Sequence, residues 1–428
     1  MTEGIQGNEF LKLVPPLQAL KVLSEFGGLE PEAAEVADAV GRVLAESVVV
    51  PHDYPPFDRA TVDGYAVRSL DVQGASNGVP ATLESIGRIE AGRVFDGRVG
   101  PGQALAVPTG GVLPRGADAV VMVEDTAEVA GGLVEVYRAA GVGRNVLHRG
   151  EDAGEGQILL VAGTRLRSHH IGALCGLGIG TASVVRRPVV GVLATGNEIV
   201  SPDQEPGPGQ IRDVNQHAMA AAVESRGWRA IRGGIVPDRL DELTASVAGL
   251  LSDCDVVLLS GGSSVGVRDL TATALERLGG RILFHGVAVK PGRPTICAMV
   301  NGKPVFGMPG HPVSSAVSFE LFVAPLLRSI EGEVFGLGEM DVRSWPDARM
   351  WPTRQRALLA RRVASVPGRD EFIRVRLRRD AQDRWMADPV PGDSSVLTSV
   401  VSAHGLVRLP AGLEGLEAGS EVEVLTYG

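Results

Sequence analysis

Between residues 188 and 330, apolar strand-like runs alternate with segments of helical period, and this alternation constrains the fold more than any other feature. The strand-like runs are rich in Val, Ile and Leu and occupy residues 188–196, 228–237, 255–262 and 281–289. An Asn301-Gly302 pair then predicts a hairpin turn, and a long helix is expected at 311–330. Such alternation predicts a mostly parallel sheet with helices on both faces.

The segments that flank this α/β region have a different pattern. Residues 12–26 predict a helix, and residues 30–47 predict a helix and a turn. From about residue 53 to 150, and again after residue 340, short apolar runs alternate with turns, which is typical of small β-rich domains. The 428 residues are enough for about three domains of ~150 residues each.

The charge balance and the cysteines argue against several classes of protein. With 41 basic and 51 acidic residues the net charge is −10, which disfavours a uniformly DNA-coating protein but allows a local basic pocket. Cys175, Cys254 and Cys297 have no CxxC spacing, so neither a disulfide framework nor a zinc site is indicated. A reducing cytoplasm is the expected location.

Two further segments bear on location. The N-terminal MTEGIQGNEF lacks a basic region and an apolar core, so we expect no signal peptide. The longest uncharged stretch is Ser168–Val185, but its histidines and glycines argue against a membrane span. We interpret it as a buried helix followed by a tight turn, and expect no membrane insertion.

The loops at one edge of the predicted sheet are the candidates for a site, because ligands of open α/β sheets bind outside the carboxyl ends of the strands. These loops follow the strand-like runs or open the last helix. They are residues 194–198, 237–238, 261–269, 290–294 and 309–315. We expect all five to lie on one edge of the sheet.

The chemistry of these loops is complementary. Backbone N–H groups, hydroxyls, a helix start and fixed cations suit an anion, and they are supplied by Gly261, Gly262, Ser263, Ser264, Lys290, Arg293, Pro312, Ser314 and Ser315. Glu198, Asp238 and Asp269 bring carboxylates to the same rim. Carboxylates beside a phosphate cradle suit Mg²⁺, which takes hard oxygen ligands and bridges to a substrate phosphate.

Each piece also has a simpler interpretation. The Gly-rich run can be a plain turn, Asp238 and Asp269 can cap the helices near them, and Lys290 and Arg293 can be solvated surface charges. Neither a GxGxxG nor a GxxxxGK[ST] motif marks a nucleotide site. In the β-rich region, the runs 55–66, 121–125 and 148–154 hold further acids, either in polar turns or in a site.

Eight motifs then occur in a fixed order: PPFDRATVDGYAVR, PTGGVLPRGADAVVMVED, HRGEDAGEG, ATGNEIV, GQIRDVN, LLSGGSSVGVRD, VAVKPGRPT and GMPGHPVSS. Together they resemble the molybdopterin molybdenumtransferase family, which includes bacterial MoeA and the E-domain of gephyrin. The resemblance runs from about residue 12 to the C-terminus.

This resemblance implies a multidomain α/β plus β fold, in an elongated subunit of four domains that forms a homodimer. The central, mostly parallel α/β domain is similar to the molybdopterin-adenylating enzymes (MogA-like), and β-rich domains flank it. The implied boundaries are 20–52 with 153–187 for domain I, 53–152 for domain II, 1–19 with 188–332 for the α/β domain III, and 333–428 for the barrel-like domain IV.

The resemblance also implies the activity. Adenylylated molybdopterin and molybdate are the substrates, Mg²⁺ is required, and molybdenum cofactor and AMP are the products. The active site lies between the α/β domain of one subunit and the β-rich domain of the other. The molybdopterin adenylyltransferase and recipient apo-molybdoenzymes are implied partners, with no nucleic acid.

Residue by residue, Glu198, Asp238 and Asp269 match acidic positions of the active-site rim, and Lys290 matches the cation of the KPG motif. The prolines that flank the helix entry in the family match Pro309 and Pro312. The acids supplied by the other subunit match Asp58, Asp152 and Glu124, and a further functional serine matches Ser399.

Three residues depart from the common family pattern: Arg59 replaces a small amide, Arg293 replaces a lysine, and His311 replaces an asparagine. None of these changes removes an acid or Lys290. Two competing functions remain open at this point. One is a catalytically weakened, gephyrin-like scaffold that binds protein partners, and the other is an adenylating enzyme that consumes ATP.

Overall fold

The computed structural model describes residues 13–261, 265–333 and 353–427, with the side chains of the helix that follows Ser264 described from Leu270 onward. The chain divides into two compact units. We call residues 1–32, 41–45 and 183–428 the α/β unit, and residues 33–40 and 46–182 the β unit.

A six-stranded sheet forms the centre of the α/β unit, in the order β16-β13-β17-β21-β20-β18. The first four neighbours are parallel, and β20 is antiparallel to both β21 and β18. The strands are β13 (Val189–Thr195), β16 (Arg229–Val236), β17 (Val256–Ser260), β18 (Arg281–His285), β20 (Ile296–Val300) and β21 (Lys303–Met308). The predicted mostly parallel sheet is therefore confirmed.

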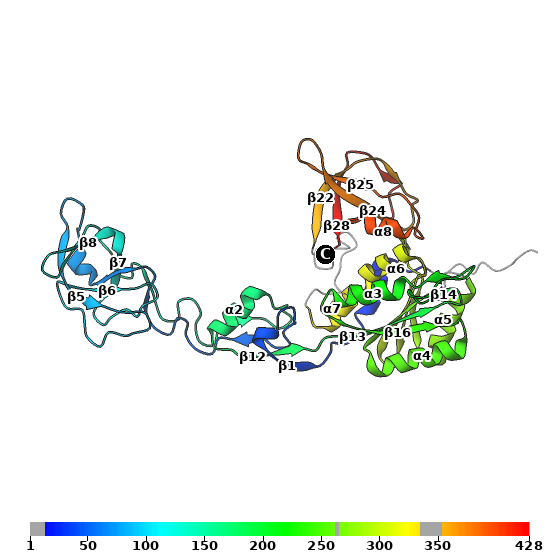
Figure 1. The fold of residues 1–428 in the computed structure, drawn as a ribbon, viewed down its shortest axis with the longest axis horizontal. Helices are drawn as coiled ribbons and strands as arrows, with labels where there is room; N and C mark the ends of the chain where they lie inside the picture. Colours follow the sequence, from blue (N-terminus) through cyan, green and yellow to red (C-terminus); the bar gives the residue numbers. More distant parts are fainter. Residues whose placement is uncertain (1–12, 262–264, 334–352, 428) are drawn as a thin grey trace, which may run out of the picture. The chain divides into compact units, whose positions relative to one another are not determined.

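Helices cover both faces of this sheet (Figure 1). The helices α1, α3, α6 and α7 pack on one face and α4 and α5 on the other. Their bounds are α1 (Pro16–Leu23), α3 (Asn215–Glu224), α4 (Leu240–Asp253), α5 (Val265–Arg277), α6 (Pro312–Ser318) and α7 (Ala324–Ile330). Successive residues of a strand point to opposite faces, so Val192 joins the first core while Leu193 joins the second.

The last helix is continuous from Pro312 to Ile330 because a π-helical turn, η4 (Phe319–Val323), joins α6 to α7. It is the one described helix that is long and apolar enough to cross a membrane, but 78% of its apolar window is buried inside the protein. Phe319 and Phe322 are fully buried in the core under the sheet. The apolar character of this helix is explained by that core.

Local details confirm some sequence predictions and correct others. Asn301 and Gly302 have φ of 52° and 78°, as a tight hairpin turn requires. The run at 281–289 is not one strand: it stops at His285, and β19 (Val289–Lys290) pairs instead with a strand of the C-terminal domain. The helix α3 begins at Asn215, and the side chain of its N-cap residue makes no capping hydrogen bond.

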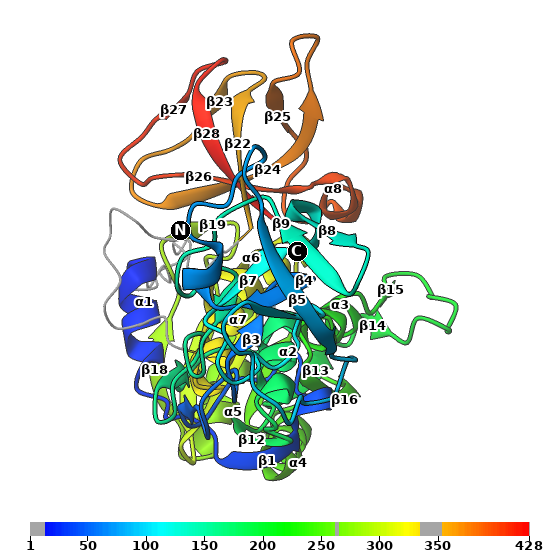
Figure 2. The ribbon, with the colours of Figure 1, turned by 90° about the vertical axis from the view of Figure 1, so that its left-hand side faces the viewer.

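A closed barrel forms the C-terminal part of the α/β unit (Figure 2). The order β24-β25-β22-β28-β26 returns to β24, because β24 also pairs with β26. The barrel strands are β22 (Arg354–Leu359), β24 (Asp370–Arg379), β25 (Trp385–Pro389), β26 (Gly405–Leu409) and β28 (Glu421–Thr426). A short pair, β23 (Val363–Ala364) and β27 (Gly415–Leu416), and a helix, α8 (Leu397–Ser402), complete it. The predicted C-terminal β-domain is confirmed.

A second six-stranded sheet, in the order β7-β4-β6-β5-β9-β8, forms the core of the β unit. Its strands are β4 (Gly64–Val67), β5 (Ala81–Arg88), β6 (Gln103–Val107), β7 (Ala119–Met122), β8 (Thr126–Val129) and β9 (Leu133–Val136). Short pairs join β2 (Val48–Val49) to β11 (Ile158–Leu160) and β3 (Arg59–Ala60) to β10 (Val146–Leu147). Three 3₁₀ turns are η1 (Val36–Asp38), η2 (Ser69–Val72) and η3 (Val123–Asp125). The predicted β-rich region is confirmed.

Two predictions near the β unit are wrong. Residues 31–35 form a strand, β1 (Pro31–Glu35), which pairs with β12 (Thr181–Val185), because tertiary pairing overrides the helix preference of the Glu- and Ala-rich run. The helix α2 (Ser168–Gly176) exists, but only its Leu174 is fully buried, so it is a surface helix rather than a buried one.

Candidate functional site

A cavity of about 660 Å³ opens at the carboxyl edge of the central sheet. We call it the edge cavity. It is lined by the ends of β13 and β17, by the segment 206–215, by the start of the last helix and by two residues before and within α8. The lining residues used below are Thr195, Glu198, Asp213, Asn215, Gly261, His311 and Pro312.

Gly261 lies where the ends of β13 and β17 approach each other. Its φ is +157°, and a Cβ atom added there would lie 2.1 Å from the carbonyl oxygen of Thr195. That separation is shorter than any real contact, so only glycine fits without movement of the strand ends. The glycine of the predicted anion loop is therefore also a packing requirement.

Asp238 is held by the last residue of β13 and by the loop that follows this strand. The hydroxyl of Thr195 donates to Asp238 Oδ1 at 2.9 Å, and the Asp238 backbone N–H donates to Asn197 Oδ1 at 3.2 Å. No side chain caps α4, so the interpretation of Asp238 as a helix cap is wrong. Asp238 does not line the edge cavity itself, whereas Glu198 lines it and is exposed.

One wall of the cavity was missed by the sequence predictions. It is built by the parallel pair of β14 (Ile199–Val200) and β15 (Ile211–Arg212) and by the residues that lead into α3. The Asn215 side chain donates from Nδ2 to the carbonyl of Gly310 at 2.7 Å, and Asp213 Oδ1 accepts the backbone N–H of Gln216 at 3.1 Å. The polar run GQIRDVN directly before a helix at this edge was the available indication.

The predicted hydroxyls at the helix entry do not face the cavity. Pro312 and His311 line it, but Ser314 and Ser315 are 6% and 2% exposed. The Ser315 hydroxyl lies 3.4 Å from the sulfur of Met219, inside the core. The assignment of Ser314 to anion binding is therefore not supported by its burial. Pro309 is buried under the same turn.

Some predicted residues lie outside the described part of the chain. These are Gly262, Ser263 and Ser264, together with the side chain of Asp269. The backbone of Asp269 lies within α5, four residues after its start at Val265, so Asp269 does not cap that helix.

Lys290 and Arg293, like Asp238, lie outside the lining of the edge cavity. The strand β19, which carries Lys290, is not part of the central sheet and pairs in parallel with β24 of the barrel. Lys290 Nζ lies 2.7 Å from Oε1 of Glu371, whose side chain is only 7% exposed. Arg293 is exposed. The edge cavity therefore contains residues of three of the five predicted loops, namely 194–198, 261–269 and 309–315.

Ser399 lies in the barrel and is 3% exposed. Its hydroxyl accepts a hydrogen bond from Arg374 Nη1 at 2.9 Å and donates to the carbonyl of Val396. Burial lowers the pKa of the Arg374 guanidinium. Ser399 lines a second cavity that shares no residue with the edge cavity.

The acids predicted in the β unit lie on two loops that are hydrogen-bonded to each other. Asp58 Oδ1 accepts the backbone N–H of Arg149 at 2.8 Å, and Asp58 Oδ2 lies 3.3 Å from His148 Nδ1. Asp152 is exposed, and its N–H donates to the carbonyl of Tyr54 at 3.2 Å. Glu124 is exposed in η3. Asp58 and Asp152 are thus brought together within one loop cluster.

The candidate ligands for a metal ion at the edge cavity are carboxylate oxygens. Within the described residues, no group of three or more His, Cys, Asp or Glu side chains is arranged to hold a metal ion. Glu198 is exposed at the cavity, and Asp238 uses one oxygen for Thr195. Since Mg²⁺ is commonly bound through one or two carboxylates plus waters and substrate phosphates, this hard-oxygen donor set fits it.

Three family models match consecutive parts of the chain. They are the MoeA N-terminal region (domain I and II) at residues 14–178, a probable molybdopterin binding domain at 191–329, and the MoeA C-terminal region (domain IV) at 356–427.

Curated relatives and solved structures match over nearly the full length. Molybdopterin molybdenumtransferase of Bacillus subtilis is 34% identical over 92% of this chain and 90% of its own. The enzyme of that name from Staphylococcus epidermidis is 30% identical over 91% of this chain and 89% of its own. A crystal structure of the molybdopterin biosynthesis MoeA protein from Pyrococcus horikoshii is 32% identical, has a TM-score of 0.80, and covers 97% of this chain and all of its own. The chain therefore belongs to the MoeA family of molybdopterin molybdenumtransferases, enzymes of molybdenum cofactor biosynthesis.

Proposed function

We propose that this protein inserts molybdenum into adenylylated molybdopterin, cleaving the phosphoanhydride and releasing AMP and the molybdenum cofactor. The observation that carries the proposal is the edge cavity, which lies where ligands of α/β sheets bind and has Glu198 and the start of a long helix in its wall. Family membership supplies the substrate class.

The residues at the cavity have different roles in this proposal, according to their chemistry. Gly261 and the helix start at Pro312 bind the phosphates, because unpaired N–H groups at a helix N-terminus attract anions. Thr195 and Asn197 orient Asp238 through the two hydrogen bonds described above. Donors held in place before the reaction stabilise charge that develops on the leaving phosphate at little reorganisation cost.

Mg²⁺, when bound, would neutralise charge on the phosphate oxygens, and Glu198 with the free oxygen of Asp238 would hold it together with Asp269. Lys290 and Arg293 contribute cations for molybdate oxygens from the loop beside the last helix. Arg293 presents a planar fork and Lys290 a point charge. Ser399 belongs to the same proposed set through its bond to Arg374.

The protein acts as a homodimer in this proposal, and the loop cluster with Asp58 and Asp152 serves the edge cavity of a second copy. The molybdopterin adenylyltransferase would supply the substrate, and apo-molybdoenzymes in the cytoplasm would take the product.

The test is AMP release from adenylylated molybdopterin by the purified protein with Mg²⁺, with and without molybdate. We expect molybdate-dependent release and a product that activates an apo-molybdoenzyme. In Asp269→Ala, turnover should fall by orders of magnitude while the protein stays folded. A folded wild-type protein that binds the substrate but releases no AMP would contradict the proposal and favour a scaffold.

A further inference from the structure

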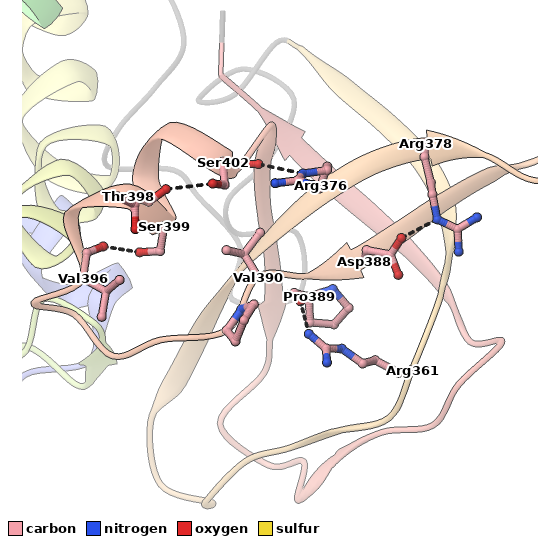
Figure 3. A pocket seen from close by; sticks show the side chains of 11 residues that line it. Arg361, Arg376, Arg378, Asp388, Pro389, Val390, Val396, Thr398, Ser399 and Ser402 are labelled. Atoms are coloured by element: carbon pink, nitrogen blue, oxygen red, sulfur yellow. Dashed lines mark hydrogen bonds and ion pairs between the residues drawn. The ribbon is translucent and has the colours of Figure 1, made fainter.

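The second cavity lies on the outer wall of the C-terminal barrel, and its volume is about 500 Å³ (Figure 3). We call it the barrel cavity. Its floor is the antiparallel pair of β24 and β25, and α8 with the segment 389–391 forms a wall. The lining side chains that carry charge or a free hydroxyl are Arg361, Arg376, Arg378, Asp388 and Thr398.

A row of arginines leads into this cavity along β24. Alternate residues of a strand share a face, so Arg374, Arg376 and Arg378 lie on one side of β24. Arg374 is buried and bonded to Ser399, whereas Arg376 and Arg378 are exposed. Arg361 follows the end of β22 and also lines the cavity.

The cations of the cavity outnumber its acids. Arg378 forms an ion pair with Asp388, the one carboxylate among the lining residues. Arg361 and Arg376 donate instead to backbone carbonyls, of Pro389 and Ser402. Neither forms an ion pair with any residue in the described part of the chain. Two guanidinium charges therefore stay uncompensated, in a protein whose net charge is −10.

A hydroxyl completes the set of donors. Ser402 Oγ donates to the carbonyl of Thr398 at 2.8 Å, while the Thr398 hydroxyl has no hydrogen-bond partner among the described residues and lines the cavity (Figure 3). Guanidinium groups bind phosphoryl oxygens in pairs through parallel N–H bonds, and a neutral hydroxyl adds a donor without a charge.

We propose that the barrel cavity is a second anion site, which binds a phosphoryl dianion between Arg361 and Arg376 with Thr398 as an additional donor. A dianion matches the two uncompensated charges, and the volume admits a phosphate with a substituent attached. The barrel cavity shares no lining residue with the edge cavity, although Ser399, which belongs to the proposed set for the reaction, lies in its wall.

The test is isothermal titration of the full-length protein with inorganic phosphate, with AMP and with adenosine, at constant ionic strength. Wild type should bind phosphate or AMP with a millimolar or lower Kd, and should not bind adenosine. Competition between phosphate and AMP would identify a nucleotide phosphoryl group as the ligand. Binding of phosphate alone would identify the free ion.

Matched variants assign the binding to the cavity. Arg361→Gln with Arg376→Gln should raise the Kd for phosphate at least about tenfold. Arg362→Gln, at the exposed neighbour that pairs with Glu417 outside the cavity, should leave the Kd within about twofold. Arg361→Lys with Arg376→Lys keeps the charge but not the fork, and should give an intermediate Kd. An unchanged Kd in the Gln pair, or no phosphate binding by wild type, would overturn the proposal.

Discussion

The ion pair between Lys290 and Glu371 is expected to stabilise the contact between the α/β domain and the barrel. The two atoms lie 2.7 Å apart, and the Glu371 carboxylate is 7% exposed while the lysine is 51% exposed. Fully exposed pairs contribute about 0.2–1 kcal/mol, and breaking a fully buried pair costs about 3–5 kcal/mol. The half-exposed geometry therefore predicts a coupling energy of about 1–2 kcal/mol.

A double-mutant cycle with Lys290→Met, Glu371→Gln and the double variant measures this coupling. Because several domains unfold in one chain, local stability is the suitable readout. Hydrogen exchange of the β19 and β24 amides that pair Val289 with Asp370 and Lys290 with Glu371 reports it directly. Each single variant should accelerate exchange, and the double variant should accelerate it by less than the sum.

One outcome would refute the coupling, and a second would refute the proposed role of Lys290 in the reaction. Additive effects within about 0.3 kcal/mol would show that the pair contributes nothing beyond its separate residues. Wild-type AMP release in Lys290→Met would contradict the proposed role of Lys290 in binding molybdate oxygens and leave only its structural role. Glu371→Gln serves as the matched control, because it breaks the same pair but keeps the cation of Lys290.

Three further predictions concern the α/β unit. Thr195→Val removes the donor to Asp238 and should lower the local stability at the end of β13 by about 1–3 kcal/mol, and unchanged hydrogen exchange of the β13 amides would contradict the importance of that bond. Gly261→Ala places a Cβ 2.1 Å from the Thr195 carbonyl and should cost about 2–4 kcal/mol, whereas a stability equal to wild type would mean that the strand ends move apart freely. Asp255 is half-buried, which opposes ionisation, but its bonds from Arg186 and from the Val189 N–H hold the pKa of the carboxyl below its ordinary 3.8. Since the unfolded chain takes up the proton first, this stabilisation should be complete above about pH 4 and lost as the pH falls through the lowered pKa. Asp255→Asn should flatten the acid limb of stability against pH, and an unaltered limb would rule out this carboxylate as its source.

Periodicity was sufficient to predict the central sheet. In β13 and β17, adjacent residues such as Val257 and Leu258 are both apolar because each faces a different helical layer. A strand buried on both faces has a continuous apolar run, which the sequence displays directly. The Asn301-Gly302 turn was equally visible, because left-handed backbone at two positions restricts the residue types.

The candidate site was less predictable, because it depends on the directions in which side chains point and on contacts between residues that are far apart in the sequence. At the start of the last helix, the positions of Ser314 and Ser315 on the helical turn direct their side chains into the core. The short strand β19 has only two residues and forms because β24, some 80 positions later, offers it a partner. No local pattern encodes such a pairing, and the position of Lys290 depends on it. The wall with Asn215 likewise forms through a bond to Gly310, which is 95 residues away.

The closure of the C-terminal barrel limits how another protein can recognise it. Each of its five strands has a neighbour on both sides within the described residues, so none of them is an edge strand along its whole length. Open edges are the usual starting points for strand addition and for aggregation. Backbone pairing at the start of β24 is already taken by β19, so another protein would contact the paired strands of this domain through side chains. Its surface charges can change during evolution, and alter its choice of partners, while the hydrogen-bonded frame stays the same.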